Sequence, residues 1–169
     1  MGREVRKVPA DWQHPKNDHG GYLPLLSSGY AGALVEWHEG LDLWCRGLRD
    51  NYKGGTEPHN ERPDVWGYVA YTGRSPNVED YMPNWTPQQA THFMMYETTS
   101  EGTPISPAFA TREELARWLA DNGASAFGAT KATYEQWLNI ARGSYAPSLV
   151  VQDGKMMSGV EAATKTSEE

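Results

Sequence analysis

The sequence predicts an α+β fold: a single domain in which a small antiparallel sheet packs with about three helices, next to an irregular N-terminal arm. Apolar side chains recur at helical spacing over 32–49, 112–122 and 131–142. Two other segments, 65–71 and 91–98, are rich in β-branched or aromatic residues and are typical of strands. Because strand and helix signals neither alternate as βαβ units nor separate completely, α+β is the simplest class.

We expect three regions along the 169 residues: an irregular arm over 1–30, one α+β domain over 31–160 and a disordered polar tail over 161–169. The arm is rich in Pro, Gly, His and Asp and has little periodicity. The apolar residues expected to pin it to the body are Trp12, Tyr22 and residues 23–26.

The first helix is predicted over 32–49, where apolar residues at spacings of three and four share one face. These residues are Leu34, Trp37, Leu41, Trp44 and Leu48. Gly40 lies within the helix and costs about 1 kcal/mol there relative to alanine. Residues 51–64, with Gly-Gly and two prolines, predict a loop.

A strand is predicted over 65–71, and it ends at Thr72-Gly73. The proline-rich stretch 74–87 has room for one helical turn around 78–82. Residues 91–98 predict a strand with two apolar faces, as expected in the interior of a sheet. One face is expected to carry Phe93, Met95 and Glu97, and the other His92, Met94 and Tyr96.

The helix predicted over 112–122 has the clearest start in the chain. Thr111 is followed three residues later by Glu114, the pattern of a capping box, and Gly123 suits the left-handed position after the helix.

A further helix is predicted over 131–142, with Thr130 as its N-cap and Gly143 at its end. Its expected inward face consists of Tyr134, Trp137, Leu138 and Ala141. After it, two apolar runs flank Asp153-Gly154, which predicts a β-hairpin because a type I′ turn needs positive φ at both central residues.

Composition and charge exclude several classes of protein. No apolar stretch approaches the roughly 20 residues of a membrane-spanning helix, and the N-terminus lacks the apolar region of a secretory signal. The 22 acidic and 15 basic residues leave a net charge of −7, and residues 17–150 carry 16 acidic against nine basic side chains. Because this excess of negative charge repels the phosphate backbone, nucleic acid is not an expected partner. The single cysteine fits a soluble protein of a reducing compartment.

No cofactor or metal is expected. His14, Asp18 and His19 are close in sequence but match no metal-binding motif. Cys45 lies in the middle of a predicted helix and not at the helix N-terminus that suits a catalytic cysteine, although Arg46 and Arg49 are near in sequence. Because buried free cysteines are common, it is expected in the core. The chain has no phosphate-binding glycine loop and no assembled nucleophile pair, so no catalytic residue is named.

The polar segment 96–107 follows an expected interior strand, where folds commonly place binding sites. The alternative is a turn closed by Ser, Thr and Gly hydrogen bonds. Of the seven tryptophans, Trp37, Trp44, Trp118 and Trp137 are expected in the core, whereas exposure of Trp12, Trp66 or Trp85 would mark a protein-binding surface. The candidate binding residues are Tyr81, Trp85, Glu97, Thr99, Ser100, Glu101 and Thr103.

Several strings resemble a family of small proteins encoded by tailed bacteriophages and prophages. They are VPADWQHP (8–15), EDYMPNW (79–85), THFMMYETTSEGTPISPAFATREELARWLADNGASAFG (91–128), ATYEQWL (132–138) and APSLV (146–150). The resemblance covers most of the chain. It implies a bacterial host cytoplasm during infection or lysogeny, but no activity and no catalytic residue.

Three hypotheses for function follow. The first is a non-enzymatic phage accessory protein that binds a host protein, for example a defence factor, through an acidic, aromatic surface near Tyr81 and Trp85. The second is an enzyme or small-ligand binder that combines loop 97–103 with His92 or His14. The third is an acidic mimic of DNA. The sequence does not identify the partner or the oligomeric state.

Overall fold

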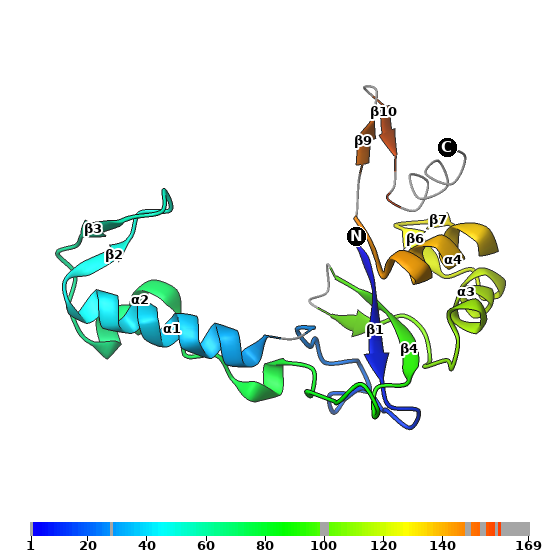
Figure 1. Ribbon diagram of the computed structural model, residues 1–169, viewed down its shortest axis with the longest axis horizontal. Helices are drawn as coiled ribbons and strands as arrows, with labels where there is room; N and C mark the ends of the chain where they lie inside the picture. Colours follow the sequence, from blue (N-terminus) through cyan, green and yellow to red (C-terminus); the bar gives the residue numbers. More distant parts are fainter. Residues whose placement is uncertain are drawn as a thin grey trace. The chain divides into compact units, whose positions relative to one another are not determined.

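The computed structural model describes residues 2–27, 29–98, 102–147, 150–152, 155–157 and 159. Contacts group the chain into two compact units. The first, here the sheet unit, joins Met1–Ser27 to Pro83–Glu169, and the second, here the helical unit, is Ser28–Met82 (Figure 1). Residues 161–169, predicted as a disordered tail, lie outside the described residues.

The sheet unit is built on an antiparallel sheet of four strands. In their order across the sheet, these are β5 (Thr103–Pro104), β4 (His92–Glu97), β1 (Arg3–Val8) and β8 (Tyr145–Ala146). The longest pairing runs from Arg3↔Glu97 to Val8↔His92. The predicted α+β class with a small antiparallel sheet is confirmed, and so is the interior strand at 92–97.

Strand β1 corrects the expectation that all of residues 1–30 are irregular, because Arg3–Val8 forms a central strand. The apolar alternation typical of a strand is absent from residues 3–8, because two of the buried positions are arginines. The sequence therefore does not predict this strand. Arg3 is 1% exposed, and its guanidinium donates to the Ser125 carbonyl at 2.9 and 2.7 Å. Arg6 is buried too and donates to the Leu25 carbonyl at 2.6 Å.

Two helices cover one face of this sheet, α3 (Arg112–Asp121) and α4 (Tyr134–Gly143) (Figure 1). The core between them and the sheet includes Met95, Leu115, Leu119, Trp137 and Ile140. The capping box of Thr111 and Glu114 is confirmed, and Gly123 has φ +59° as expected.

Helix α4 begins three residues later than predicted. Its N-cap is Thr133, which forms a second capping box with Gln136, whereas Thr130 belongs to a short strand. That strand, β7 (Thr130–Lys131), pairs with β6 (Ser125–Phe127) between the two helices. The predicted C-terminal hairpin is confirmed as β9 (Val150–Gln152) paired with β10 (Lys155–Met157), and its Asp153-Gly154 turn lies outside the described residues.

The helical unit is organised around α1 (Tyr30–Cys45), which confirms the first predicted helix but ends four residues before its expected end. Gly47, with φ +78°, stops the helix, and a short hairpin of β2 (Leu48–Asp50) and β3 (Thr56–Pro58) follows. Gly40 is needed inside α1 because a Cβ atom at this position would overlap the Tyr68 hydroxyl.

The strand predicted over 65–71 is wrong: these residues form helix α2 (Val65–Thr72). The Asp64 side chain accepts hydrogen bonds from the backbone N–H groups of Trp66 and Gly67, so local capping outweighs the β preference of the aromatic residues. The helical turn expected around 78–82 is a 3₁₀ turn, η1 (Val78–Asp80).

Candidate functional site

The loop after β4, predicted as a binding site, begins with a carboxylate that serves the sheet. Glu97 Oε1 accepts a hydrogen bond from the buried Arg3 guanidinium at 3.1 Å. Burial lowers the pKa of Arg3, and the Glu97 charge opposes that shift. Thr103 pairs with Glu97 in the sheet, and Thr99, Ser100 and Glu101 lie outside the described residues.

Strand alternation separates Glu97 from His14. Glu97 and Met95 are on the face that packs against the helices, whereas Tyr96 is on the opposite face, where its hydroxyl meets His14. Glu97 and His14, one of the combinations that the second hypothesis allows, therefore lie on opposite faces of the sheet, and Glu101, the other carboxylate considered, lies outside the described residues. His92, the other histidine considered, has its Nδ1 3.0 Å from the Thr91 hydroxyl.

A buried polar network covers the face of the sheet opposite the helices. His14 Nε2 is 2.6 Å from the Leu23 carbonyl, so it donates, and Nδ1 is left to accept from the Tyr96 hydroxyl at 3.2 Å. The Trp12 indole N–H donates to the same hydroxyl at 3.2 Å. The Arg6 guanidinium lies 4.4 Å from the centre of the Tyr96 ring. The network ties the N-terminal segment to β4, as the sequence predicts for Trp12.

Two pKa shifts follow from this burial. Burial raises the pKa of the Tyr96 hydroxyl to about 12. Burial also lowers the pKa of His14, and the nearby Arg6 charge lowers it further, against the opposing effect of the Leu23 carbonyl. Both groups are therefore neutral at pH 7, and the hydroxyl proton can reach either His14 Nδ1 or the Met94 sulfur 3.4 Å away.

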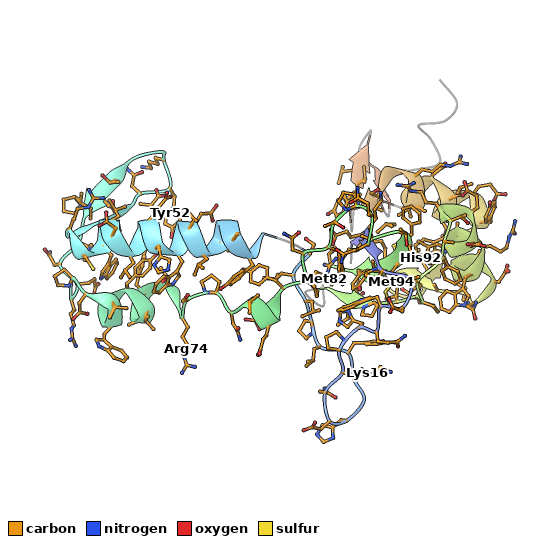
Figure 2. The ribbon with its side chains drawn as sticks, turned by 60° about the horizontal axis from the view of Figure 1, so that its bottom comes forward. Lys16, Tyr52, Arg74, Met82, His92 and Met94 are labelled. Carbon is orange, nitrogen blue, oxygen red and sulfur yellow. The ribbon has the colours of Figure 1, made fainter. Side chains whose placement is uncertain are left out.

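A cavity of about 600 Å³ lies beside this network and is called the His14 cavity below. Its walls come from the N-terminal segment, from the edge of the sheet at 104–108 and from α3. They include Trp12, His14, Lys16, Tyr22, Met94 and Trp118. Figure 2 places Met94 on the sheet and Lys16 on the N-terminal loop. The sequence analysis singled out Trp12 and His14 but did not predict this cavity. The cavity forms where the N-terminal segment meets β4, and the contact that joins them, between His14 and Tyr96, spans 82 residues of sequence.

The two aromatic residues named as binding candidates are both half-buried. Tyr81 belongs to the helical unit and packs edge-on against Tyr30, with ring centres 5.5 Å apart. Trp85 belongs to the sheet unit and packs edge-on against Trp12 at 4.7 Å. Both rings stabilise their own unit, which leaves little of either for a partner.

Trp66, one of the three tryptophans whose exposure would mark a binding surface, has a side chain that is 69% exposed. Trp66 and Tyr71 both belong to α2. A hydrogen bond between the Tyr71 and Tyr52 side chains raises the pKa of the Tyr71 hydroxyl. Tyr52 is 86% exposed (Figure 2). These three aromatic residues, together with the neighbouring Glu61, are called the Trp66 surface below.

A rigid base supports the Trp66 surface. The buried Trp44 ring stacks with His59 at 3.8 Å and with Tyr71 at 4.7 Å, and its indole N–H donates to the Arg62 carbonyl at 2.8 Å. A hollow of about 490 Å³ opens over this base, with Gly67 and Ala70 of α2 on its floor. Trp44, Glu61, Arg62, Trp66 and Tyr71 complete its lining. Gly67 is needed in this lining because a Cβ atom there would overlap the Arg62 carbonyl.

Within the described ranges, no group of three or more His, Cys, Asp and Glu side chains lies close enough to hold a metal ion. This includes His14, Asp18 and His19. Cys45, expected in the core, is exposed, because it follows the buried Trp44 by one residue and therefore lies about 100° further around α1. Of the four tryptophans expected in the core, Trp44 and Trp137 are fully buried, and Trp37 and Trp118 are half-buried.

No protein-family model, curated protein or solved structure matches the chain. None of the helices in its described part is long and apolar enough to cross a membrane.

Proposed function

We propose that the protein is a non-enzymatic phage or prophage accessory protein that binds a host or phage protein through the Trp66 surface. The observation that carries this proposal is a largely exposed tryptophan on a preformed aromatic base. The resemblance to phage proteins supports a partner in the bacterial cytoplasm, for example a defence factor.

The exposed area of the Trp66 surface is energetically significant. A tryptophan buries roughly 150–250 Å² when it is fully covered, and about 25 cal/mol is gained per Å² of apolar surface removed from water. Covering the exposed two-thirds of Trp66 therefore contributes about 3 kcal/mol before ordering costs. This is the energy of an interface hot spot, and tryptophan and tyrosine are the residue types enriched there.

The charge of the helical unit indicates what kind of partner fits. Arg62 beside the hollow is paired with Asp64, so its charge is compensated. In the part of the chain that the structure describes, no cation forms an ion pair with Glu61, Glu36 or Glu39. The hydrogen bond with Glu57 raises the pKa of Arg49, and the charge of Glu61 helps to raise it. A partner segment with an apolar side chain for the hollow and a lysine or arginine for Glu61 complements this surface.

The test compares capture from a bacterial lysate by the immobilised full-length protein, its Trp66→Ala variant and its Tyr145→Ala variant. Tyr145 is a matched control, because it is an aromatic residue of the sheet unit with 57% exposure. We expect a protein that wild type and Tyr145→Ala retain at about 0.15 M salt, and that Trp66→Ala loses. Identical retention by all three proteins, or no specific retention by wild type, would contradict the proposal.

A further inference from the structure

The His14 cavity differs in charge from two other hollows of the described residues. The hollow of the Trp66 surface has both Glu61 and Arg62 in its lining. The depression on α3 has three carboxylates, Glu113, Glu114 and Asp121, against Arg117. The described lining of the His14 cavity contains Lys16 and no carboxylate. In a chain with a net charge of −7, a concave site with one cation and no acid favours a negatively charged ligand.

The two buried polar side chains of the wall, His14 and Ser106, already have hydrogen-bond partners. Both nitrogens of His14 are engaged, by the Leu23 carbonyl and by Tyr96. The Ser106 hydroxyl accepts from the Met95 N–H at 2.9 Å and donates to the Pro107 carbonyl at 2.8 Å. These groups hold the wall in place, and they are not available to a ligand without breaking a buried hydrogen bond.

Lys16 remains available. Its ammonium group lies 4.8 Å from the centre of the Tyr22 ring, and no carboxylate among the described residues forms an ion pair with it. Lys16 is exposed on the N-terminal loop (Figure 2), so an anion can reach it without an initial desolvation cost.

The remaining lining suits a flat ring. Trp12 is fixed by its hydrogen bond to Tyr96 and by its edge-on contact with Trp85, so its indole is a preorganised wall. Trp118 and the Met94 thioether add further apolar surface. A volume of about 600 Å³ lies within the range of small-molecule sites.

We propose that the His14 cavity binds a small anion that carries a planar aromatic ring, with the ring between Trp12, Met94 and Trp118 and the anionic group at Lys16. A ring bearing a phosphate, as in a nucleotide, and a ring bearing a carboxylate share this chemistry. The proposal is independent of the Trp66 surface, because every residue that it uses belongs to the sheet unit.

The test uses the full-length protein with labelled methionine methyl groups and four probes. Two are anions, adenosine monophosphate and indole-3-acetate, and two are their uncharged analogues, adenosine and indole-3-acetamide. The Met94 methyl resonance reports on the cavity, and calorimetry gives the affinity. We expect at least one anion to bind with a Kd of about 1 mM or below and to shift the Met94 signal. Which anion binds distinguishes the phosphate from the carboxylate.

The Lys16 variants decide whether the charge matters. We expect Lys16→Gln to weaken binding of the anion by roughly tenfold, to the level of its uncharged analogue, and Lys16→Arg to restore it. Both variants change an exposed side chain, so folding is preserved. No Met94 shift with either anion at millimolar concentration would overturn the proposal, and so would equal affinity for the anion and its analogue or for wild type and Lys16→Gln.

Discussion

The buried Arg3 offers the sharpest test of how the sheet is held together. Replacing it with methionine keeps an unbranched side chain in β1 but removes the guanidinium. That group donates to the Ser125 carbonyl twice, to the Gly2 carbonyl at 3.1 Å and to Glu97 at 3.1 Å. The change therefore removes two hydrogen bonds to the Ser125 carbonyl, one to the Gly2 carbonyl and the ion pair with Glu97.

The expected loss follows from these contacts. Removing one partner of a buried ion pair costs about 3–5 kcal/mol, and the lower end applies because Glu97 is 20% exposed and regains some hydration. We therefore expect Arg3→Met to lower the free energy of unfolding by about 3 kcal/mol. For a chain of this length, this corresponds to a fall in Tm of roughly 10 °C.

Urea unfolding followed by circular dichroism measures the effect, and the double variant Arg3→Met/Glu97→Gln isolates its cause. Together with the single variant Glu97→Gln it completes a mutant cycle, and we expect its loss to be about 1 kcal/mol smaller than the sum of the losses of the two single variants. A loss below about 1 kcal/mol for Arg3→Met would refute the structural role of Arg3. Losses that simply add in the double variant would refute the coupling between Arg3 and Glu97.

Three further variants or conditions probe other parts of the structure. Because the pKa of His14 is lowered in the fold, the unfolded chain takes up the proton first as the pH falls. The free energy of unfolding is therefore highest above about pH 6.5 and decreases below it. The difference in this free energy between urea titrations at about pH 7.5 and 5.5 should be smaller for His14→Gln than for wild type. Gly40→Ala should destabilise α1 by about 1 kcal/mol or more despite the higher helix propensity of alanine, since the new Cβ overlaps the Tyr68 hydroxyl; a gain in thermal stability would contradict this. Tyr96→Phe should cost about 1–2 kcal/mol, because it strands the Trp12 N–H and removes the donor to His14; an unchanged urea midpoint would show that the network contributes nothing.

Elements with local signals were predictable from the sequence. The capping box at Thr111 and Glu114, the pairing of the two apolar runs in the C-terminal hairpin and the apolar strand at 92–97 each depend on residues close in sequence, and each has its expected element. Thr130 and Thr133 are both suitable N-cap residues by type, so the local sequence does not distinguish them. The structure has Thr133 as the N-cap of α4, three residues after the predicted Thr130.

Elements defined by distant partners were not predictable. Strand β1 buries Arg3 and Arg6, and the groups that satisfy them, Ser125 and Leu25, are 122 and 19 residues away. Helix α2 has a strand-like composition, and only the capping by Asp64 distinguishes it. The His14 cavity depends in the same way on a contact between segments far apart in the chain.

Loss of affinity on truncating Trp66 is the result on which the proposed function depends. With the captured partner purified, calorimetry should give a Kd for wild type and for Tyr145→Ala that agree within about twofold. From the exposed area of Trp66, we expect Trp66→Ala to raise the Kd by about 30-fold or more. A Kd for Trp66→Ala within about twofold of wild type would contradict binding through this surface.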